Sequence, residues 1–370
     1  MIMVANLEAK SKMSPWQLAI LVAAVGIGTE IISGGRALAE SAGEHEWLAF
    51  LLGGILYCGV ALLMVKLSEY YPDQDFLEYI PQLWGKVLGS LIIALLVLLF
   101  IGYFALALGN FSRVITIFMF DRTPPEVIGI AMAIACVYCA LQDFGTILRI
   151  IQFIFIITVP LFFLVFSTGA LSVQFDNVLP LWPQHIGKVL TSIPNTWGAY
   201  AGYEIILLLF PLVYRRNTNP SIAVASAFGC MGFIYVFFGF LTIGVLSAEN
   251  AKTLAYPAME VVRFVELPGT FLERLEIYLL GAWIPNVFTS LALYLYAPAY
   301  VLRRLCGHVD HRPWVLLIIP WLIFVSTFFT DMNLVVQTMA KGIKIVGLSF
   351  SFIIIPMSLA LAWLQKRRNQ

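Results

Sequence analysis

The feature that most constrains this chain is a succession of apolar stretches, most of them about twenty residues long, separated by short polar connections. A hydrocarbon core of about 30 Å takes roughly 20 helical residues to cross, and it offers the backbone no water to bond to. The stretches therefore predict about ten membrane-spanning helices, at residues 15–39, 47–66, 87–118, 125–141, 145–169, 191–213, 220–248, 274–302, 313–330 and 342–364.

The composition agrees with this prediction. Of the 370 residues, 61% are hydrophobic and only 12% are charged, whereas soluble domains carry about a quarter charged residues. A water-soluble fold of this size would expose large apolar patches. The chain is therefore expected to be an all-α polytopic membrane protein, and not a soluble enzyme, a nucleic-acid-binding protein or a disordered chain.

The basic residues predict the orientation, because Lys and Arg accumulate in cytoplasmic loops. The tight clusters Arg215–Arg216, Arg303–Arg304 and Lys366–Arg368 all fall on one side if the spans alternate. Both termini are then expected in the cytoplasm. The first residues lack the apolar core and cleavage site of a secretory signal peptide, so the first span is expected to stay in the mature protein.

Two spans contain glycine-rich interruptions that carry an acid. In span one Gly26–Glu30 is followed by Ser33–Arg36, and in span six the interruption is Gly198–Glu204. Glycine and polar residues weaken a helix, and a lipid environment tolerates a break only where the freed backbone faces protein or a water-filled cavity. Helices one and six are therefore predicted to be broken.

Two connections are also alike, because each begins with Tyr-Pro and continues as a short amphipathic segment. After Tyr71-Pro72, polar residues recur at Gln74, Glu78 and Gln82. After Tyr256-Pro257, they recur at Glu260, Arg263 and Glu266. Both segments predict short helices that lie on the protein or at the interface.

These parallels predict two halves of one design within a single domain of residues 1–370. The halves are a first five-helix repeat over 14–170 and a second over 191–364, threaded in opposite senses. In such a fold the broken helices one and six meet near the midplane, where N–H ends favour an anionic group and exposed carbonyls favour a cation. A zwitterion such as an amino acid fits both.

Ionisable groups at membrane depth are costly and usually face a cavity or a partner. Glu30 and Glu204 are the first candidates, with a structural carboxylate that caps a half-helix as the alternative. Tyr103 fits either a cavity wall or a packed aromatic residue. Thr289 fits either a ligand contact or a hydrogen bond between helices.

No metal or cofactor site is expected. Cys136 and Cys139 form a CxxC inside an apolar run, which favours helix packing. The segment from Cys306 to His311 matches no strong zinc spacing. No Walker A, Rossmann, HExxH or GxSxG motif occurs, so the chain is not expected to be an enzyme.

Three segments resemble the spore germination permease family: KMSPWQLAILVAAVGIGTEIISGGR, GAYAGYEIILLLFP and YPAMEVVRFVELPGTFLERLEIYLLGAWI. These are the B subunits of endospore germinant receptors, within the amino acid–polyamine–organocation (APC) superfamily. The resemblance implies a five-plus-five APC-type fold in the inner membrane of a bacterial spore, a small germinant as ligand, and A-type and lipoprotein C-type partner subunits.

In such folds the ligand pocket lies between spans one, three, six and eight. Together with the acids and glycines at the two breaks, the resemblance predicts these ligand-binding residues: Gly26, Gly28, Thr29, Glu30, Tyr103, Gly198, Ala199, Tyr200, Glu204 and Thr289. The bulky Tyr200 is expected to narrow the pocket.

Two functions remain open at this point. The first is a germinant-sensing receptor subunit, in which a ligand biases one conformation and passes that bias to partner subunits. The second is a proton-coupled amino acid transporter that uses Glu30 or Glu204.

Overall fold

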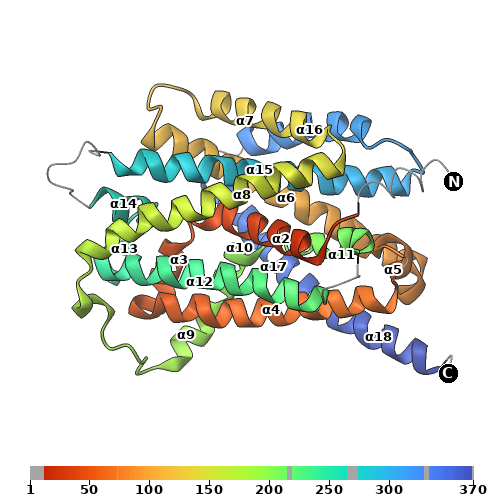
Figure 1. The fold of residues 1–370 in the computed structure, drawn as a ribbon, viewed down its shortest axis with the longest axis horizontal. Coiled ribbons are helices and arrows are strands. Elements are labelled where there is room, and N and C mark those ends of the chain that lie inside the picture. The colour runs from red at the N-terminus through yellow and green to blue at the C-terminus, as the bar shows by residue number, and fades with distance from the viewer. Residues whose placement is uncertain (1–11, 73, 215–218, 265–273, 329–332, 369–370) are drawn as a thin grey trace.

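The computed structural model describes the whole chain except residues 1–11, 73, 215–218, 265–273, 329–332 and 369–370. The described part is a bundle of helices (Figure 1). Its β-type pairing is a single bridge between Met13 and Val213. Because a helix satisfies its own backbone hydrogen bonds, this architecture suits a chain that spans a bilayer.

Six helical segments of the described chain are long and apolar enough to cross a membrane. They contain α4 (Glu46–Tyr70), α6 (Lys86–Phe118), α8 (Phe144–Ser167), α12 (Pro220–Leu246), α15 (Leu275–Leu305) and the run α17–η7–α18 (Asn333–Ser349, Phe350–Ile354, Ile355–Arg368). Shorter apolar helices are α2 (Pro15–Glu30), α7 (Pro125–Ala140) and α16 (Arg312–Phe328). Each predicted span coincides with helical residues, and the chain is a multi-pass membrane protein.

The break in span one lies later than the glycines predicted. Helix α2 continues through Gly26 and Gly28 to Glu30, the chain turns at 31–34, and α3 follows at Gly35–Ala42. The physical reason is close helix packing. A side chain on Gly28 would meet the Ser290 hydroxyl and lie 2.6 Å from the Asn286 carbonyl oxygen of α15.

Span six is broken where the sequence predicted. It consists of α9 (Ile186–Ser192), η5 (Ile193–Thr196), α10 (Trp197–Tyr200), a non-helical turn at 201–204, α11 (Ile205–Leu209) and η6 (Phe210–Leu212). Gly202 has φ +96°, a left-handed conformation that L side chains rarely adopt. The turn at 201–204 therefore depends on glycine at this position.

The two predicted amphipathic helices are present as α5 (Phe76–Trp84) and α14 (Pro257–Arg263). Helix α5 buries its apolar face against α6, while Glu78 is exposed. Helix α14 buries Ala258, Val261 and Val262. Glu266 lies outside the described residues. The remaining short helices are η2 (Gly43–His45), η3 (Thr168–Ser172), η4 (Phe175–Val178) and α13 (Ala248–Ala251).

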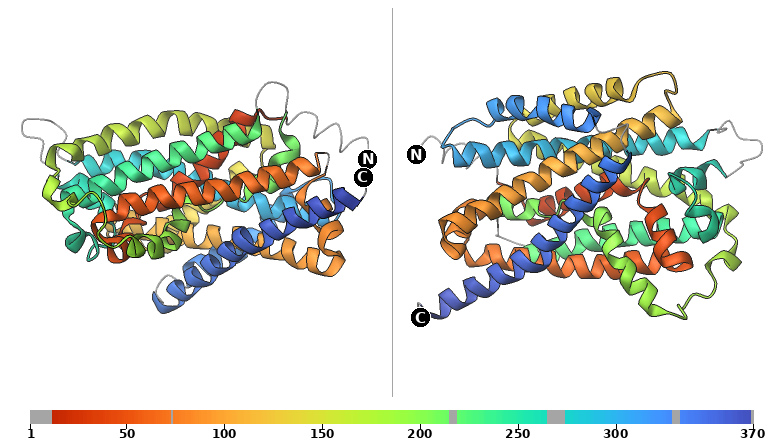
Figure 2. Two further views of the ribbon diagram at one scale, coloured as in Figure 1. Left: turned by 90° about the horizontal axis from the view of Figure 1, so that it is seen from below. Right: turned by 180° about the vertical axis from the view of Figure 1, so that it is seen from behind.

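The broken segments lie in the middle of the bundle. Helix α2 packs against α12, α15 and α8, and α10 packs against α2 and α4, so both lie between the pairs α8/α15 and α4/α12 (Figure 1). Helices α7 and α16 pack together on one flank, and the run α17–η7–α18 crosses the bundle obliquely (Figure 2). Helices α5 and α18 reach one end of the bundle, and α13 and α14 lie at the other.

We predict that Gly28→Val destabilises the protein by about 1–3 kcal/mol, because the added atoms overpack the α2–α15 contact. Gly59→Val is the matched control, since a side chain at this exposed position on α4 meets nothing within 4 Å. The measurement is the thermal unfolding midpoint of each purified variant. Equal midpoints for the two variants would contradict the packing role of Gly28.

Candidate functional site

A small cavity lies beside the two breaks, with a volume of about 70 Å³. Its walls come from α2, α6, the α10 segment and α15. The residues that line it are Glu30, Tyr103, Leu106, Ala107, Asn110, Trp197, Gly198, Ala201 and Tyr294. Spans one, three, six and eight thus all contribute to one cavity.

Glu30 is the last residue of α2, so its carboxylate lies where the first helix ends. The Ser33 hydroxyl donates a hydrogen bond to Glu30 Oε2 at 3.2 Å. Gly198 lies against the same side chain, because a Cβ atom at position 198 would be only 3.1 Å from Glu30 Cδ. The two glycine-rich segments therefore meet at this carboxylate.

A line of polar groups connects Glu30 to helix α14. The Asn110 amide donates to the Ser33 hydroxyl at 3.3 Å, and the Tyr256 hydroxyl donates to Asn110 Oδ1 at 3.4 Å. Tyr256 immediately precedes α14. The cavity is thus linked by hydrogen bonds to the amphipathic helix that follows span seven.

Glu204 lies at the break in span six and is fully buried. Its Oε1 accepts a hydrogen bond from the Tyr103 hydroxyl at 3.0 Å, and its Oε2 accepts one from the Gly202 backbone N–H at 3.0 Å. Within the described chain no basic side chain forms an ion pair with it. Its carboxylate therefore accepts a backbone N–H at the turn, where the helical hydrogen bonds are interrupted. Both of these hydrogen-bond donors are neutral groups.

Aromatic side chains form the rest of the cavity wall. The Tyr103 ring lies 5.3 Å from that of Tyr294 and 5.6 Å from that of Trp197, measured between centroids. The Trp197 indole N–H is buried and has no hydrogen-bond partner among the described residues. A buried donor of this kind costs free energy unless a ligand or water satisfies it.

Of the predicted site residues, the structure brings Glu30, Tyr103 and Gly198 to the cavity, and it bonds Glu204 to Tyr103. Sequence reasoning missed Trp197, Asn110 and Tyr294. A signal for Asn110 existed, because it follows Tyr103 by seven residues and so shares a face of α6 with it. Tyr294 follows Asn286 by eight residues and Ser290 by four, so these three residues share a face of α15.

Most of the other predicted residues do not line this cavity. Gly26 packs against Met231 of α12, and Ala199 is buried beside it. The Tyr200 hydroxyl donates to the Phe50 carbonyl oxygen at 2.8 Å, so this ring faces α4 and does not narrow the cavity. Thr289 donates to the Asn286 carbonyl oxygen of its own helix at 2.8 Å. Thr29 is part of α2, but its side chain lies outside the described residues.

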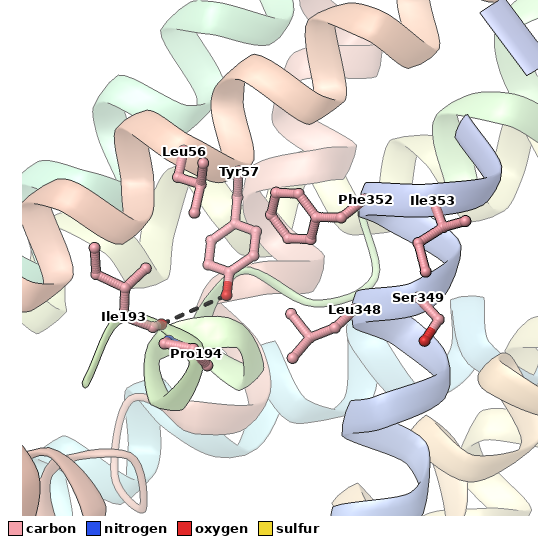
Figure 3. Close-up of a pocket in the computed structure, with 8 residues that line it drawn as sticks. All are labelled: Leu56, Tyr57, Ile193, Pro194, Leu348, Ser349, Phe352 and Ile353. Atoms are coloured by element: carbon pink, nitrogen blue, oxygen red, sulfur yellow. Dashed lines mark hydrogen bonds between the residues drawn. The ribbon is translucent and has the colours of Figure 1, made fainter. Parts of the chain in front are cut away.

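A second, apolar hollow of about 290 Å³ lies between α4, η5 and the run α17–η7 (Figure 3). Tyr57 forms part of its wall and donates a hydrogen bond to the Ile193 carbonyl oxygen at 3.5 Å. The Tyr203 hydroxyl is 2.7 Å from the hydroxyl oxygen of Ser351 in η7. Span ten is thus tied directly to the turn that contains Glu204.

A family model described as "Spore germination protein" matches residues 12–335. The chain belongs to the spore germination protein family. This match covers both breaks, the cavity and the two amphipathic helices. It confirms the family resemblance that the N-terminal, span-six and Tyr-Pro segments predicted.

Curated relatives from Bacillus subtilis (strain 168) agree with this assignment. The chain is 29% identical to spore germination protein YndE over 293 residues, which cover 78% of this chain and 79% of that protein. It is 23% identical to spore germination protein B2 over 365 residues, which cover 97% and 98% of the two chains. It is 24% identical to spore germination protein A2 over 297 residues, which cover 80% and 81%.

Solved transporter structures share the fold. A nucleobase-cation-symport-1 family transporter in a closed conformation with bromovinylhydantoin bound matches with a TM-score of 0.66 at 14% identity, covering 97% of this chain and 80% of that chain. A Na⁺-coupled sialic acid symporter in a substrate-bound, outward-open state matches with a TM-score of 0.66 at 12% identity, covering 95% and 78%. This spore germination protein therefore has the transporter fold that the broken helices predicted.

We predict that Tyr103→Phe destabilises the protein by about 1–3 kcal/mol, because Glu204 Oε1 then loses its side-chain donor in a buried site. Glu204→Gln in the Tyr103→Phe background should cost less than the sum of the two single changes, since the two groups share one hydrogen bond. Thermal unfolding of the four proteins in a double-mutant cycle measures this coupling. Strictly additive effects would show that the bond contributes nothing.

Proposed function

We propose that this chain is the germinant-sensing subunit of a spore germinant receptor and that its ligand is a small amino acid. The observation that carries this proposal is the cavity beside the two breaks, which is lined by the Glu30 carboxylate and by Trp197, whose buried N–H has no hydrogen-bond partner among the described residues. Family membership supports a role in spore germination. No enzymatic activity and no cofactor are proposed.

The cavity walls match the two charges of an amino acid. The Glu30 carboxylate is a partner for an ammonium group, since charge-assisted hydrogen bonds are the stronger ones. The indole N–H of Trp197 and the amide of Asn110 are neutral donors that suit a carboxylate. The aromatic rings of Tyr103 and Tyr294 leave an apolar wall for a short side chain.

The size of the cavity supports coupling between binding and conformation. The cavity is the smallest of the three described in this structure, with a volume of about 70 Å³. A ligand that does not fit this volume needs a wider cavity, and it binds the widened state better than the state described here. Such differential affinity is what shifts a conformational equilibrium.

The signal is proposed to pass to A-type and lipoprotein C-type partner subunits in the spore inner membrane. Both termini are proposed to lie in the cytoplasm, as the distribution of Lys and Arg favours. Helix α14 is a candidate route for the signal on the opposite side, because hydrogen bonds through Ser33, Asn110 and Tyr256 connect it to Glu30.

A proton-coupled amino acid transporter is the second candidate function. The observation that favours it is Glu204, a fully buried carboxylate at the break whose hydrogen-bond donors are neutral. Buried acids inside membrane bundles often carry protons. A sensor and a carrier share such a pocket and differ in whether the transport cycle completes.

Purified protein in sealed lipid vesicles separates the two functions. The sensor predicts saturable binding of an amino acid with no net uptake under an imposed pH gradient. The carrier predicts uptake driven by that gradient, abolished in Glu204→Gln. A screen of the twenty common amino acids with neither binding nor uptake would contradict both functions.

We predict that Gly198→Ala weakens amino acid binding by about tenfold or more, because the added methyl group presses on the Glu30 carboxylate and fills the cavity. Gly229→Ala on α12 is the matched control, since its side chain meets nothing within 4 Å. Calorimetric titration with the amino acid found in the screen measures both. If Gly198→Ala binds like Gly229→Ala, the pocket lies elsewhere.

A further inference from the structure

A third cavity, of about 540 Å³, lies at the end of the bundle that holds α5. It is separate from the cavity at Glu30 and shares no lining residue with it, although helix α15 contributes to both. Its walls are the first turns of α8, the last turns of α15, the end of span six and the connection that leads into α16. The lining residues are Asp143, Phe144, Gly145, Thr146, Arg149, Leu212, Tyr296, Tyr300, Arg303, Val309, Asp310, His311 and Arg312.

Three arginines from three helices line this cavity. Arg149 of α8 donates to the Thr146 hydroxyl at 3.0 Å, and Arg312 at the start of α16 donates to the Leu141 carbonyl oxygen at 3.0 Å. The guanidinium of Arg303 lies 5.0 Å from the centre of the Tyr300 ring. Each of the two hydrogen bonds uses one of the five N–H groups of its guanidinium, so both side chains keep donors for a further acceptor.

Two carboxylates are also present, and they offset only part of this charge. Asp310 Oδ1 accepts a hydrogen bond from the Arg312 backbone N–H at 3.0 Å. Asp143 precedes α8 and makes no capping hydrogen bond with its side chain. His311 Nε2 is 2.9 Å from the Ala140 carbonyl oxygen, and burial lowers the pKa of this imidazole, which disfavours its charged form.

The start of α8 adds to the positive potential. This helix has 24 residues, and its axis dipole places partial positive charge at the N-terminal end, where Phe144 and Gly145 line the cavity. The backbone N–H groups of Thr146 and Ile147 both donate to the Asp143 carbonyl oxygen, at 2.8 Å and 3.1 Å. The first turn of α8 and three arginines thus line one cavity.

We propose that this cavity binds a phosphate group, carried either by an acidic phospholipid headgroup or by a soluble phosphate compound. Planar guanidiniums bind phosphate oxygens in pairs, and a helix N-terminus binds them through its N–H groups. Basic pockets between spanning helices at a membrane surface are a known type of site for acidic headgroups.

The surroundings favour the lipid source. Further along the same two helices, Phe153 and Ile157 of α8 are 68% and 50% exposed, and Leu316 and Leu317 of α16 are 55% and 59% exposed. Large exposed apolar side chains in a membrane protein face the acyl chains of lipids. A headgroup in the cavity would therefore have apolar surface beside it for its acyl chains.

An occupant would also contact the end of span six through Leu212. The Leu212 carbonyl oxygen accepts a hydrogen bond from the Met13 backbone N–H at 2.9 Å, and the Tyr214 N–H donates to the Met13 carbonyl oxygen at 2.7 Å. These bonds join the segment before α2 to the end of span six. The phosphate site thus lies against the point where both broken spans are tied together.

Native mass spectrometry of the purified full-length protein tests the lipid source, with phosphatidylglycerol and phosphatidylcholine as competing probes. The wild type should retain phosphatidylglycerol preferentially. Arg149→Gln should weaken this retention by about tenfold, because one charge-assisted contact is lost. Asp143→Asn should strengthen it, since a repulsive charge is removed while asparagine remains a good residue before a helix.

Lys86→Gln is the matched control, because Lys86 is an exposed cation at the same end of the bundle and does not line the cavity. Its retention of phosphatidylglycerol should equal that of the wild type. A parallel thermal-shift titration with pyrophosphate tests the soluble source, and a saturable stabilisation with the same order of variants would support it. If neither probe distinguishes Arg149→Gln, Asp143→Asn and Lys86→Gln, the proposal is wrong.

Discussion

The structure depends on one constraint, which is that backbone groups inside a bilayer must find hydrogen-bond partners within the protein. Long helices meet this constraint along most of the chain. The turns at 31–34 and 201–204 interrupt two of the central helices, and there the protein must supply other partners. Polar side chains that would be costly in contact with lipid, such as Glu30, Ser33 and Glu204, lie at these two turns.

Glu204 shows how the constraint and the chemistry are connected. Its carboxylate accepts the Gly202 N–H at the turn, and the Tyr103 hydroxyl holds its other oxygen. The same residue that completes the broken backbone is therefore a buried acid beside a cavity. Glu30 has the corresponding place at the end of α2, where Ser33 donates to it and Gly198 allows span six to approach. An acid thus lies at each break.

Much of this could be predicted from the sequence, because the signals were local. Apolar stretches of known length predicted the helices, and the glycine and acid at 202 and 204 predicted the break in span six. The glycines at 26 and 28 predicted the wrong position for the break in span one. A glycine that makes room for Ser290 has the same sequence signature as one that ends a helix. Trp197, Asn110 and Tyr294 reach the cavity from three different helices. Their convergence depends on how the helices pack against one another, which no local pattern records.

The most direct measurement is an experimental density map of the chain in lipid nanodiscs, with and without a saturating amino acid. The proposed germinant site predicts new density between Glu30, Trp197 and Gly198 in the ligand-bound map, with both helices still interrupted after Glu30 and Tyr200. Ligand density at another place, or continuous helices through 31–34 and 201–204 with no space between them, would contradict it.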